Sequence, residues 1–336
     1  METLIYEQLD DQRVKCQICH HFCVIKEGKR GICGVRENKG GRLLSLVYPR
    51  VIARSVDPIE KKPLFHLKPG SFAYSIATVG CNFKCAFCQN ADIAHMPSDN
   101  KGMIQGSGFS PEAIVNEALG TGCDSIAYTY TEPTVFVELA LETAMLARKQ
   151  GLLNVFVTNG YMSPQVLDML APVLDAANVD LKAFDDRFYK TYCKARLEPV
   201  KETIKRMKDL GILVEITTLL IPGLNDGQSD LEAMAHFIAT DIGRETPWHI
   251  SRFHPCYQMM DRSPTPLSSL ERAYEAGRQA GLRYVYIGNV PGQSSENTYC
   301  HSCNAVLVKR YAYQIETYFQ EGGKCPNCDT IAYGIY

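Results

Sequence analysis

Short apolar runs alternate with longer amphipathic segments through the middle of the chain. Seven runs rich in β-branched and aromatic residues predict strands, because polar or turn-forming residues follow them. These runs occupy residues 72–79, 125–129, 154–158, 178–182, 212–220, 248–253 and 283–287. Between them, apolar residues recur at helical spacing. The predicted helices begin at Ser110-Pro111 and cover residues 134–150, 164–170, 200–210, 229–238 and 268–281.

The repeated strand–helix order predicts a parallel sheet, because parallel strands need long crossover connections. We therefore expect an α/β fold over residues 71–290, a partial TIM-like barrel of six to seven units. Residues 1–70 would form a Cys-rich segment with an extended lead-in, and residues 291–336 a zinc-ribbon-like tail. In barrels of this kind functional residues gather at the C-terminal ends of the strands.

Length and charge narrow the class of protein. The 336 residues, 46% of them hydrophobic, can hold one barrel-sized domain with small appendages. Thirty-five basic and thirty-seven acidic residues give a net charge of -2, so nothing indicates steering to nucleic acid or to an anionic membrane. The first eleven residues lack the basic start and apolar core of a signal peptide, and no run reaches bilayer-spanning length. We expect a cytoplasmic protein.

Eleven of the fourteen cysteines fall into three groups, which favours metal binding over a disulfide framework. The N-terminal group is Cys16, Cys19, Cys23 and Cys33, the loop group is Cys81, Cys85 and Cys88, and the tail group is Cys300, Cys303, Cys325 and Cys328. Only Cys123, Cys193 and Cys256 stand apart from these groups.

The loop group follows the first predicted barrel strand and Gly80, in the order Cys-x3-Cys-x2-Cys. Each of the three cysteines can hold one iron of a 4Fe–4S cube, because thiolate is the ligand that iron–sulfur clusters require. The fourth iron then has no protein ligand and can chelate an external molecule. A zinc knuckle is the alternative interpretation of the triplet.

With Phe87 before its last cysteine, the loop group resembles the signature of the radical S-adenosylmethionine (SAM) superfamily. The resemblance implies a (βα)6 barrel and a free iron that binds the amino and carboxylate groups of SAM. It also implies that an electron from the cluster cleaves SAM to methionine and a 5′-deoxyadenosyl radical. That radical then takes a hydrogen atom from a small-molecule or protein substrate.

Glu132 and Pro133 end the second predicted strand and resemble the Gly-Gly-Glu-Pro element of glycyl-radical activating enzymes, with the glycines replaced. The resemblance implies that Glu132 holds the methionyl amino group of SAM. A carboxylate is a suitable acceptor for an ammonium group. The alternative is that Glu132 only caps the following helix.

The next two strand ends carry further cofactor-binding candidates. Thr158 and Asn159 resemble the family's Thr-Asn-Gly element, which lies near the ribose and methionyl group, although an Asn-Gly turn explains the pair equally well. Lys182 occupies the position where the activating enzymes direct a lysine at the SAM carboxylate, with Asp180 as its orienting neighbour. An ammonium group there would neutralise that carboxylate.

The fifth and sixth strand ends give two more candidates from the same resemblance. Ile221 begins a turn similar to the family's apolar-Pro-Gly-x-Asn-Asp element, which contacts adenine, but turn chemistry alone also accounts for it. His254 lies where the activating enzymes place a histidine near the ribose, and a structural hydrogen-bonding role is the alternative. Cys193 follows the fourth strand and either packs as a small apolar residue or takes part in the chemistry.

The two remaining cysteine groups predict further metal sites. Four sulfurs in the N-terminal group would close a tetrahedral zinc site or hold a second iron–sulfur cluster, and unmetallated thiols are a third possibility. The tail group has two Cys-x2-Cys pairs separated by twenty-one residues, which predicts a zinc ribbon, with a mononuclear iron as the alternative.

The whole set of motifs resembles one branch of the superfamily. The N-terminal group with Gly-Ile-Cys-Gly-Val-Arg at 31–36, the loop group, residues 287–290 and the tail group are similar to the AmmeMemoRadiSam system radical enzyme, near the pyruvate formate-lyase activating enzymes. The resemblance implies Memo-like and AMMECR-like proteins as partners. Flavodoxin or ferredoxin is the expected reductant, because SAM cleavage needs the low end of the roughly -700 to +450 mV range of cluster potentials.

Two other functions stay open from the sequence. The first is an activating enzyme that installs a glycyl radical on a partner protein. The chain lacks a ferredoxin-like insert after the loop group, which is a point against it. The second is a non-catalytic iron–sulfur or zinc assembly protein.

Overall fold

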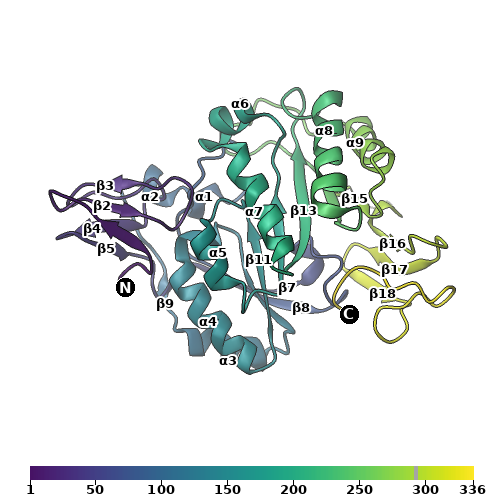
Figure 1. Cartoon of the computed structure of the whole chain (residues 1–336), viewed down its shortest axis with the longest axis horizontal. Helices are drawn as coiled ribbons and strands as arrows, with labels where there is room; N and C mark the ends of the chain where they lie inside the picture. The colour runs from purple at the N-terminus through teal and green to yellow at the C-terminus, as the bar shows by residue number, and fades with distance from the viewer. Residues whose placement is uncertain (291–293) are drawn as a thin grey trace.

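The computed structural model describes residues 1–290 and 294–336. A small set of N-terminal strands lies at one end of the molecule, a large α/β unit lies in the middle, and C-terminal strands lie at the other end (Figure 1). The predicted boundary between residues 290 and 291 adjoins the residues outside this description. Within the described residues, every helix is too short or too polar to span a lipid bilayer.

The central sheet has eight strands in the order β15-β14-β13-β12-β11-β10-β8-β7. Seven of them are parallel, and β7 pairs antiparallel with β8 at one edge. The strands are β7 (Ala53–Pro58), β8 (Phe72–Ala77), β10 (Ser125–Tyr128), β11 (Leu153–Thr158), β12 (Ala176–Asp180), β13 (Leu213–Leu220), β14 (Trp248–Arg252) and β15 (Val285–Gly288). The predicted α/β class and parallel order are confirmed. The closure into a (βα)6 barrel stays a prediction.

Helices connect the parallel strands and shield the sheet from solvent (Figure 1). The longer ones are α3 (Pro111–Gly120), α4 (Val137–Lys149), α5 (Pro164–Leu170), α7 (Leu197–Asp209), α8 (Gln228–Phe237) and α9 (Leu267–Gln279). Shorter helical turns are η1 (Ile59–Lys61), α1 (Ala91–Ala94), α2 (Met96–Asp99), η2 (Pro133–Phe136), α6 (Asp186–Phe188), η3 (Tyr189–Cys193), η4 (Ile238–Gly243) and η5 (Ser294–Glu296).

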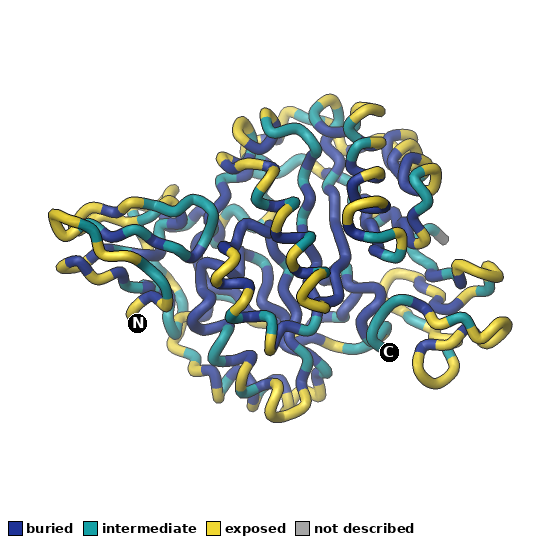
Figure 2. Tube along the Cα trace, in the orientation of Figure 1, coloured by how far each residue is buried: buried dark blue, intermediate teal, exposed yellow. Residues whose placement is uncertain are grey.

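Local sequence explains where these helices begin and which face they bury. Ser110 caps α3 by accepting a hydrogen bond from the backbone of Ala113, with proline at the first helical position, as predicted. Helix α7 buries Val200, Ile204 and Met207, which recur at helical spacing. Figure 2 shows the resulting pattern, with buried positions concentrated in the strands and exposed positions on the outer faces of the helices.

Short strands build the N-terminal module, which we define as residues 1–52. They are β1 (Tyr6–Gln8), β2 (Val14–Cys16), β3 (Val24–Ile25), β4 (Arg36–Lys39), β5 (Arg42–Ser45) and β6 (Arg50–Val51), and β6 pairs with β9 (Ser107–Gly108). Arg36 fastens the module to α4 through a bidentate ion pair, in which its two terminal nitrogens lie 2.7 and 2.9 Å from the Glu138 carboxylate oxygens. Both side chains are almost fully buried, so each charge depends on the other.

The C-terminal module contains β16 (Thr298–Tyr299), β17 (Val306–Tyr311) and β18 (Gln314–Thr317). It packs on the floor of the sheet, where the parallel strands begin. There Arg310 donates a 2.8 Å hydrogen bond to the backbone oxygen of Phe65. The buried Glu215 carboxylate accepts hydrogen bonds from the backbone of His66 (2.8 Å) and the ring of His249 (2.6 Å). Burial lowers the pKa of His66 to about 4, so this ring is neutral at pH 7.

The buried ion pair makes a testable prediction about stability. The Glu138→Ala variant leaves the Arg36 charge buried without its partner, and we expect its free energy of unfolding to fall by about 3–5 kcal/mol. Denaturant unfolding monitored by circular dichroism measures this change.

The matched control is Arg54→Ala, which breaks the exposed ion pair with Glu117. Exposed pairs contribute about 0–1 kcal/mol, so this variant should unfold close to the parent. Equal losses in the two variants would contradict the role assigned to the buried pair.

Candidate functional site

The loop group follows β8 in a segment that backbone contacts hold on both sides. The backbone N–H groups of Lys84 and Ala86 donate 2.9 Å hydrogen bonds to the oxygens of Cys193 and Tyr192, respectively. Gln258 donates a 3.0 Å hydrogen bond to the Ala86 oxygen from the other side. The segments that follow β12 and β14 therefore both fix the loop, which pre-positions its three thiols.

Gly80 lets the chain turn from β8 into this loop. Its φ is +96°, a conformation that residues with a Cβ rarely adopt. A Cβ at this position would also lie 2.4 Å from Cγ1 of Val35 in the N-terminal module. Only glycine fits this close approach, so the module and the cysteine loop are packed directly against each other.

Burial makes the thiols of the loop group poor acids when no cation is near. It raises the pKa of Cys88 to about 12 and the pKa of Cys81 well above the usual value. A hydrogen bond with Cys193, together with burial, raises the pKa of Cys85 well above its usual range. A bound metal would compensate the thiolate charges, as metal binding with loss of the thiol protons requires.

Glu132 joins the ends of β10 and β11. Its Oε1 accepts hydrogen bonds from the backbone of Thr134 (3.1 Å) and the hydroxyl of Thr158 (2.8 Å), and the Thr134 hydroxyl also donates to it. Its Oε2 accepts a 2.8 Å hydrogen bond from the backbone of Asn159. Glu132 is the N-cap of η2, so the capping role that was predicted as the alternative is observed, whereas the ligand role stays a prediction. Oε2 still has capacity to accept a hydrogen bond from a ligand.

Burial raises the pKa of Glu132, while its four hydrogen-bond donors act in the opposite direction. The side chain is almost inaccessible to solvent, so those donors replace the water that a carboxylate needs.

Asn159 connects these strand ends to the loop group. Its side-chain Nδ2 donates a 2.7 Å hydrogen bond to Oδ1 of Asn82 and lies 3.9 Å from the sulfur of Cys81. Asn82 is buried, and within residues 1–290 and 294–336 its Nδ2 has no hydrogen-bond partner. A buried amide donor without a partner is costly, which suits a position beside a bound group. The sequence did not single out Asn82, although its place between two cysteines was a signal.

Lys182 and Asp180 lie at the end of β12, close to the same loop. The Lys182 ammonium is 2.9 Å from the Asp180 carboxylate and 5.7 Å from the centre of the Phe87 ring. Burial lowers the pKa of Lys182, but the Asp180 carboxylate raises it, and negative charge on Cys85 or Cys193 would act in the same direction, so the net shift is upward. The ammonium is therefore charged, and it lies beside Phe87, the residue before Cys88.

The last two cofactor-binding candidates, Ile221 and His254, differ in burial and in hydrogen bonding. Ile221 is fully buried, and its backbone donates a 2.7 Å hydrogen bond to Oδ1 of Asn225. Asn225 in turn donates a 2.6 Å hydrogen bond to the backbone oxygen of Lys182, so this turn is tied to the β12 end. His254 is exposed, and in the described part of the chain it has no hydrogen bond. The structure therefore does not bring His254 together with the other candidates.

Cys193 lies beside the loop group and is fully buried. Cys256 also reaches the loop, because its sulfur donates a 3.3 Å hydrogen bond to the Phe87 oxygen. Sequence reasoning noted both cysteines but had no means of placing them here.

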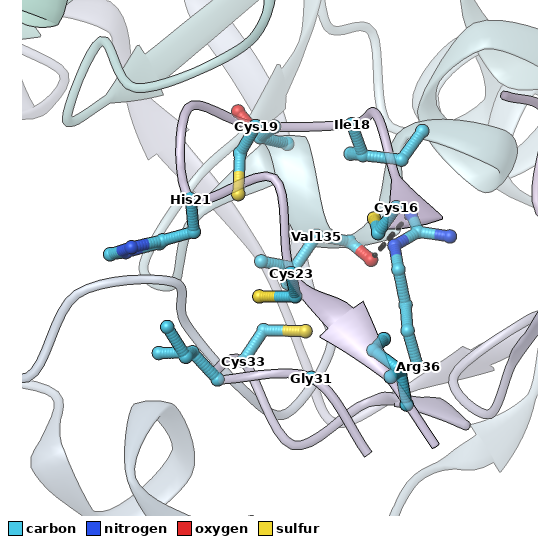
Figure 3. A pocket seen from close by; sticks show the side chains of 12 residues that line it. Cys16, Ile18, Cys19, His21, Cys23, Gly31, Cys33, Arg36 and Val135 are labelled. Carbon is cyan, nitrogen blue, oxygen red and sulfur yellow. Dashed lines mark hydrogen bonds between the residues drawn. The ribbon is translucent and has the colours of Figure 1, made fainter. Parts of the chain in front are cut away.

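The tail group converges on one point. All four sulfurs lie within 4.8 Å of one another, with Cys300 and Cys328 3.6 Å apart and Cys303 and Cys325 3.5 Å apart. A tetrahedral site with zinc–sulfur bonds of about 2.3 Å separates its sulfurs by about 3.8 Å. The tail group therefore fits a single metal ion. The N-terminal group instead lines a cavity with His21 and Arg36 (Figure 3).

Comparisons with known proteins give matches over much of the chain. The Radical SAM superfamily matches residues 75–238. An uncharacterized protein of Methanocaldococcus jannaschii is 49% identical over 312 residues, which cover 93% of this chain and 92% of that protein. Another protein of that organism, provisionally named a glycyl-radical enzyme activating enzyme, is 31% identical over 49% of this chain and 62% of its own length.

A solved structure shows the same fold. The radical SAM methyltransferase from Sphaerobacter thermophilus matches with a TM-score of 0.51 at 14% identity. The match covers 66% of this chain and 67% of that chain.

The converging tail sulfurs make a prediction about metal content. We expect one zinc ion per chain in the purified protein and none in the Cys300→Ser, Cys325→Ser double variant. Structural zinc contributes roughly 10–16 kcal/mol, so residues 297–336 should also become sensitive to protease. Elemental analysis and limited proteolysis measure both effects.

The control is Cys123→Ser, which replaces a buried cysteine outside the three groups and should keep the zinc. A tail that remains protease-resistant after losing its metal would contradict the structural role.

Proposed function

Because the chain belongs to the Radical SAM superfamily, we propose that it is an enzyme that cleaves S-adenosylmethionine reductively and abstracts a hydrogen atom from a substrate. The loop group would hold a 4Fe–4S cluster with one iron left for SAM. The observation that carries the proposal is the arrangement around this loop, where the Lys182 ammonium lies 5.7 Å from the centre of the Phe87 ring and Asn159 contacts Asn82. The substrate is a small molecule or a protein residue.

The residues of the loop fit the cofactors of this superfamily. Three thiols on one loop are a donor set for three irons of a cube, and Asn82, which directly follows Cys81, has an unpartnered Nδ2 that can donate a hydrogen bond. When bound, a 4Fe–4S cluster would supply the low-potential electron, and SAM the 5′-deoxyadenosyl radical, that hydrogen abstraction requires.

Two charged side chains would orient the methionyl part of SAM. The Lys182 ammonium, held by Asp180, would neutralise its carboxylate. Oε2 of Glu132 would accept a hydrogen bond from its amino group, because this oxygen has one protein donor. Thr158 and Asn159 hold the Glu132 carboxylate in place, because each donates a hydrogen bond to it. Such pre-positioning lowers the cost of ordering the ligand.

The remaining roles are part of the same proposal. The turn at Ile221 would contact adenine, and His254 would approach the ribose by a rearrangement of its exposed loop. The tail group would hold zinc. We place the protein in the cytoplasm as an AmmeMemoRadiSam system enzyme, with Memo-like and AMMECR-like proteins as partners and flavodoxin or ferredoxin as the reductant.

A second candidate function is activation of a glycyl-radical enzyme. It is favoured by the 31% identity to the provisionally named activating enzyme, which covers 49% of this chain. Electron paramagnetic resonance (EPR) detects a glycyl radical on a candidate partner after anaerobic incubation with the reduced protein and SAM. A doublet that depends on both components would favour this function.

The cysteine set of the cluster gives the first functional prediction. We expect Cys85→Ser to lose the loop-bound iron and all 5′-deoxyadenosine formation, because that thiolate is a ligand. Cys193→Ser is the matched control, since it changes a buried thiol that contacts Cys85. It should keep both the iron and the product.

Iron and sulfide analysis and chromatography of the reaction mixture measure the outcome. Loss of loop-bound iron in Cys193→Ser would mean that a side chain fills the fourth coordination position, which contradicts SAM chelation. Absence of 5′-deoxyadenosine from fully reconstituted protein with candidate partners would favour the non-catalytic assembly protein.

Lys182 gives the second functional prediction. We expect Lys182→Met to weaken SAM binding about ten- to a hundredfold, because hydrogen bonds to charged groups contribute about 1.5–3 kcal/mol. Lys190→Met is the control, since that lysine pairs with Asp186 at an exposed site. Equilibrium dialysis of labelled SAM with cluster-loaded protein measures the affinity, and equal affinities in the two variants would refute the assignment.

A further inference from the structure

The N-terminal group surrounds one cavity in the N-terminal module. Cys16 ends β2, Cys23 precedes β3, Cys33 precedes β4, and Cys19 lies in the connection between β2 and β3. Figure 3 shows their side chains around the cavity, with Arg36 at its side. Four cysteines from four different points of the chain thus line the same space.

The cavity adjoins the C-terminal ends of the parallel strands. Thr134 and Val135, two and three residues after Glu132, line its wall. The backbone of His20 donates a 3.0 Å hydrogen bond to the Tyr161 oxygen, and Cys19 forms a β-bridge with Met162. These contacts hold the N-terminal group against the ends of β10 and β11.

The same cavity is close to the loop group. His21 lines the cavity but directs its ring away from the cysteines (Figure 3), and Nε2 of this ring is hydrogen-bonded to the backbone oxygen of Asn82 at 2.8 Å. Asn82 directly follows Cys81. The His21 side chain therefore links the N-terminal module directly to the loop group.

The separation of the sulfurs distinguishes the two classes of metal site. Throughout residues 1–290 and 294–336, the tail group is the set of candidate ligands that converges as a single-ion site, with its sulfurs within 4.8 Å of one another. The N-terminal group does not form such a set, although all four of its cysteines line one cavity. A single tetrahedral zinc ion requires sulfurs about 3.8 Å apart. The tail group thus shows how a single-ion site appears in this protein, and the sulfurs of the N-terminal group do not have that arrangement.

The surroundings of the cavity also suit a cluster. Ile18, Ile25 and Val135 supply apolar wall, which limits the access of water. Arg36 is fixed in the same wall by Glu138 and by the Val135 oxygen at 3.2 Å. A guanidinium at this place provides hydrogen-bonding capacity and positive charge near four thiolates.

We propose that Cys16, Cys19, Cys23 and Cys33 hold a second iron–sulfur cluster, a 4Fe–4S cube closed by four thiolates. Ligation releases the four thiol protons, and every iron then has a protein ligand. This cluster therefore does not bind SAM. The inference goes beyond the proposed function and does not depend on it, because it rests on the N-terminal residues alone.

The experiment counts metals in variants of the full chain after anaerobic reconstitution with iron and sulfide. The triple variant Cys81→Ala, Cys85→Ala, Cys88→Ala removes the loop group and leaves the N-terminal group intact. We expect it to retain about four irons and four sulfides per chain, half of the parent content. Its dithionite-reduced EPR spectrum should show a cluster that does not respond to SAM.

The complementary variant Cys19→Ala, Cys23→Ala should lose the SAM-insensitive signal and keep the loop-bound iron. Cys123→Ser is the matched control and should keep the parent content of iron, sulfide and zinc. The triple variant provides the decisive count even if the double variant fails to fold, because its N-terminal module is unchanged.

Two results for the triple variant would overturn the proposal. One is a second zinc ion per chain without iron, which means a single-ion site. The other is the absence of metal apart from the tail zinc, which means free thiols. The two proposals can fail separately. If the parent protein does not cleave SAM but the triple variant still holds about four irons, the proposed function is refuted and the second cluster is supported.

Discussion

The geometry of the candidate site depends on one buried carboxylate. Glu132 has no access to bulk water, so its charge requires the donors that surround it. Those donors come from Thr134, Thr158 and Asn159, and they fix the ends of two neighbouring strands relative to each other. Asn159 carries the constraint on to Asn82 and the cysteine loop. A change at Glu132 would therefore disturb the loop as well as a ligand contact.

The sequence predicted the parallel sheet and most of the strand-end residues for a definite physical reason. Strand period and turn residues locate the point where each strand ends, and parallel strands bring these points to one edge. Glu132, Asn159 and Lys182 meet near the loop group for that reason. Asn82 was missed because loop residues follow no period, and Asn225 was noted only as part of a turn, without its hydrogen bond to Lys182. His254 shows the limit of the rule, since a strand end fixes the backbone but not the direction of a side chain.

The three cysteine groups show what spacing determines. Spacing predicted that each group binds metal, because it limits how far the chain can separate the thiols. It did not distinguish one ion from several, because sulfur separation depends on how the strands and loops around the cysteines pack. The tail group converges within 4.8 Å, whereas the N-terminal group lines a cavity whose wall also includes Thr134 and Val135 of the central α/β unit. The different arrangement of the sulfurs in the two groups is therefore visible only in the folded structure.

The two appended modules act on opposite ends of the same strands. The N-terminal module contacts Tyr161 and Asn82 near the C-terminal ends of the parallel strands, which we call the mouth. The cofactor-binding candidates lie at this end. The C-terminal module contacts the floor, where Glu215 and His249 form a buried pair at the strand starts. In barrels of this kind the mouth carries chemistry and the floor carries stability. If both modules bind metal as proposed, its loss from the N-terminal module should affect the cysteine loop first, whereas its loss from the tail should affect the packing where the parallel strands begin.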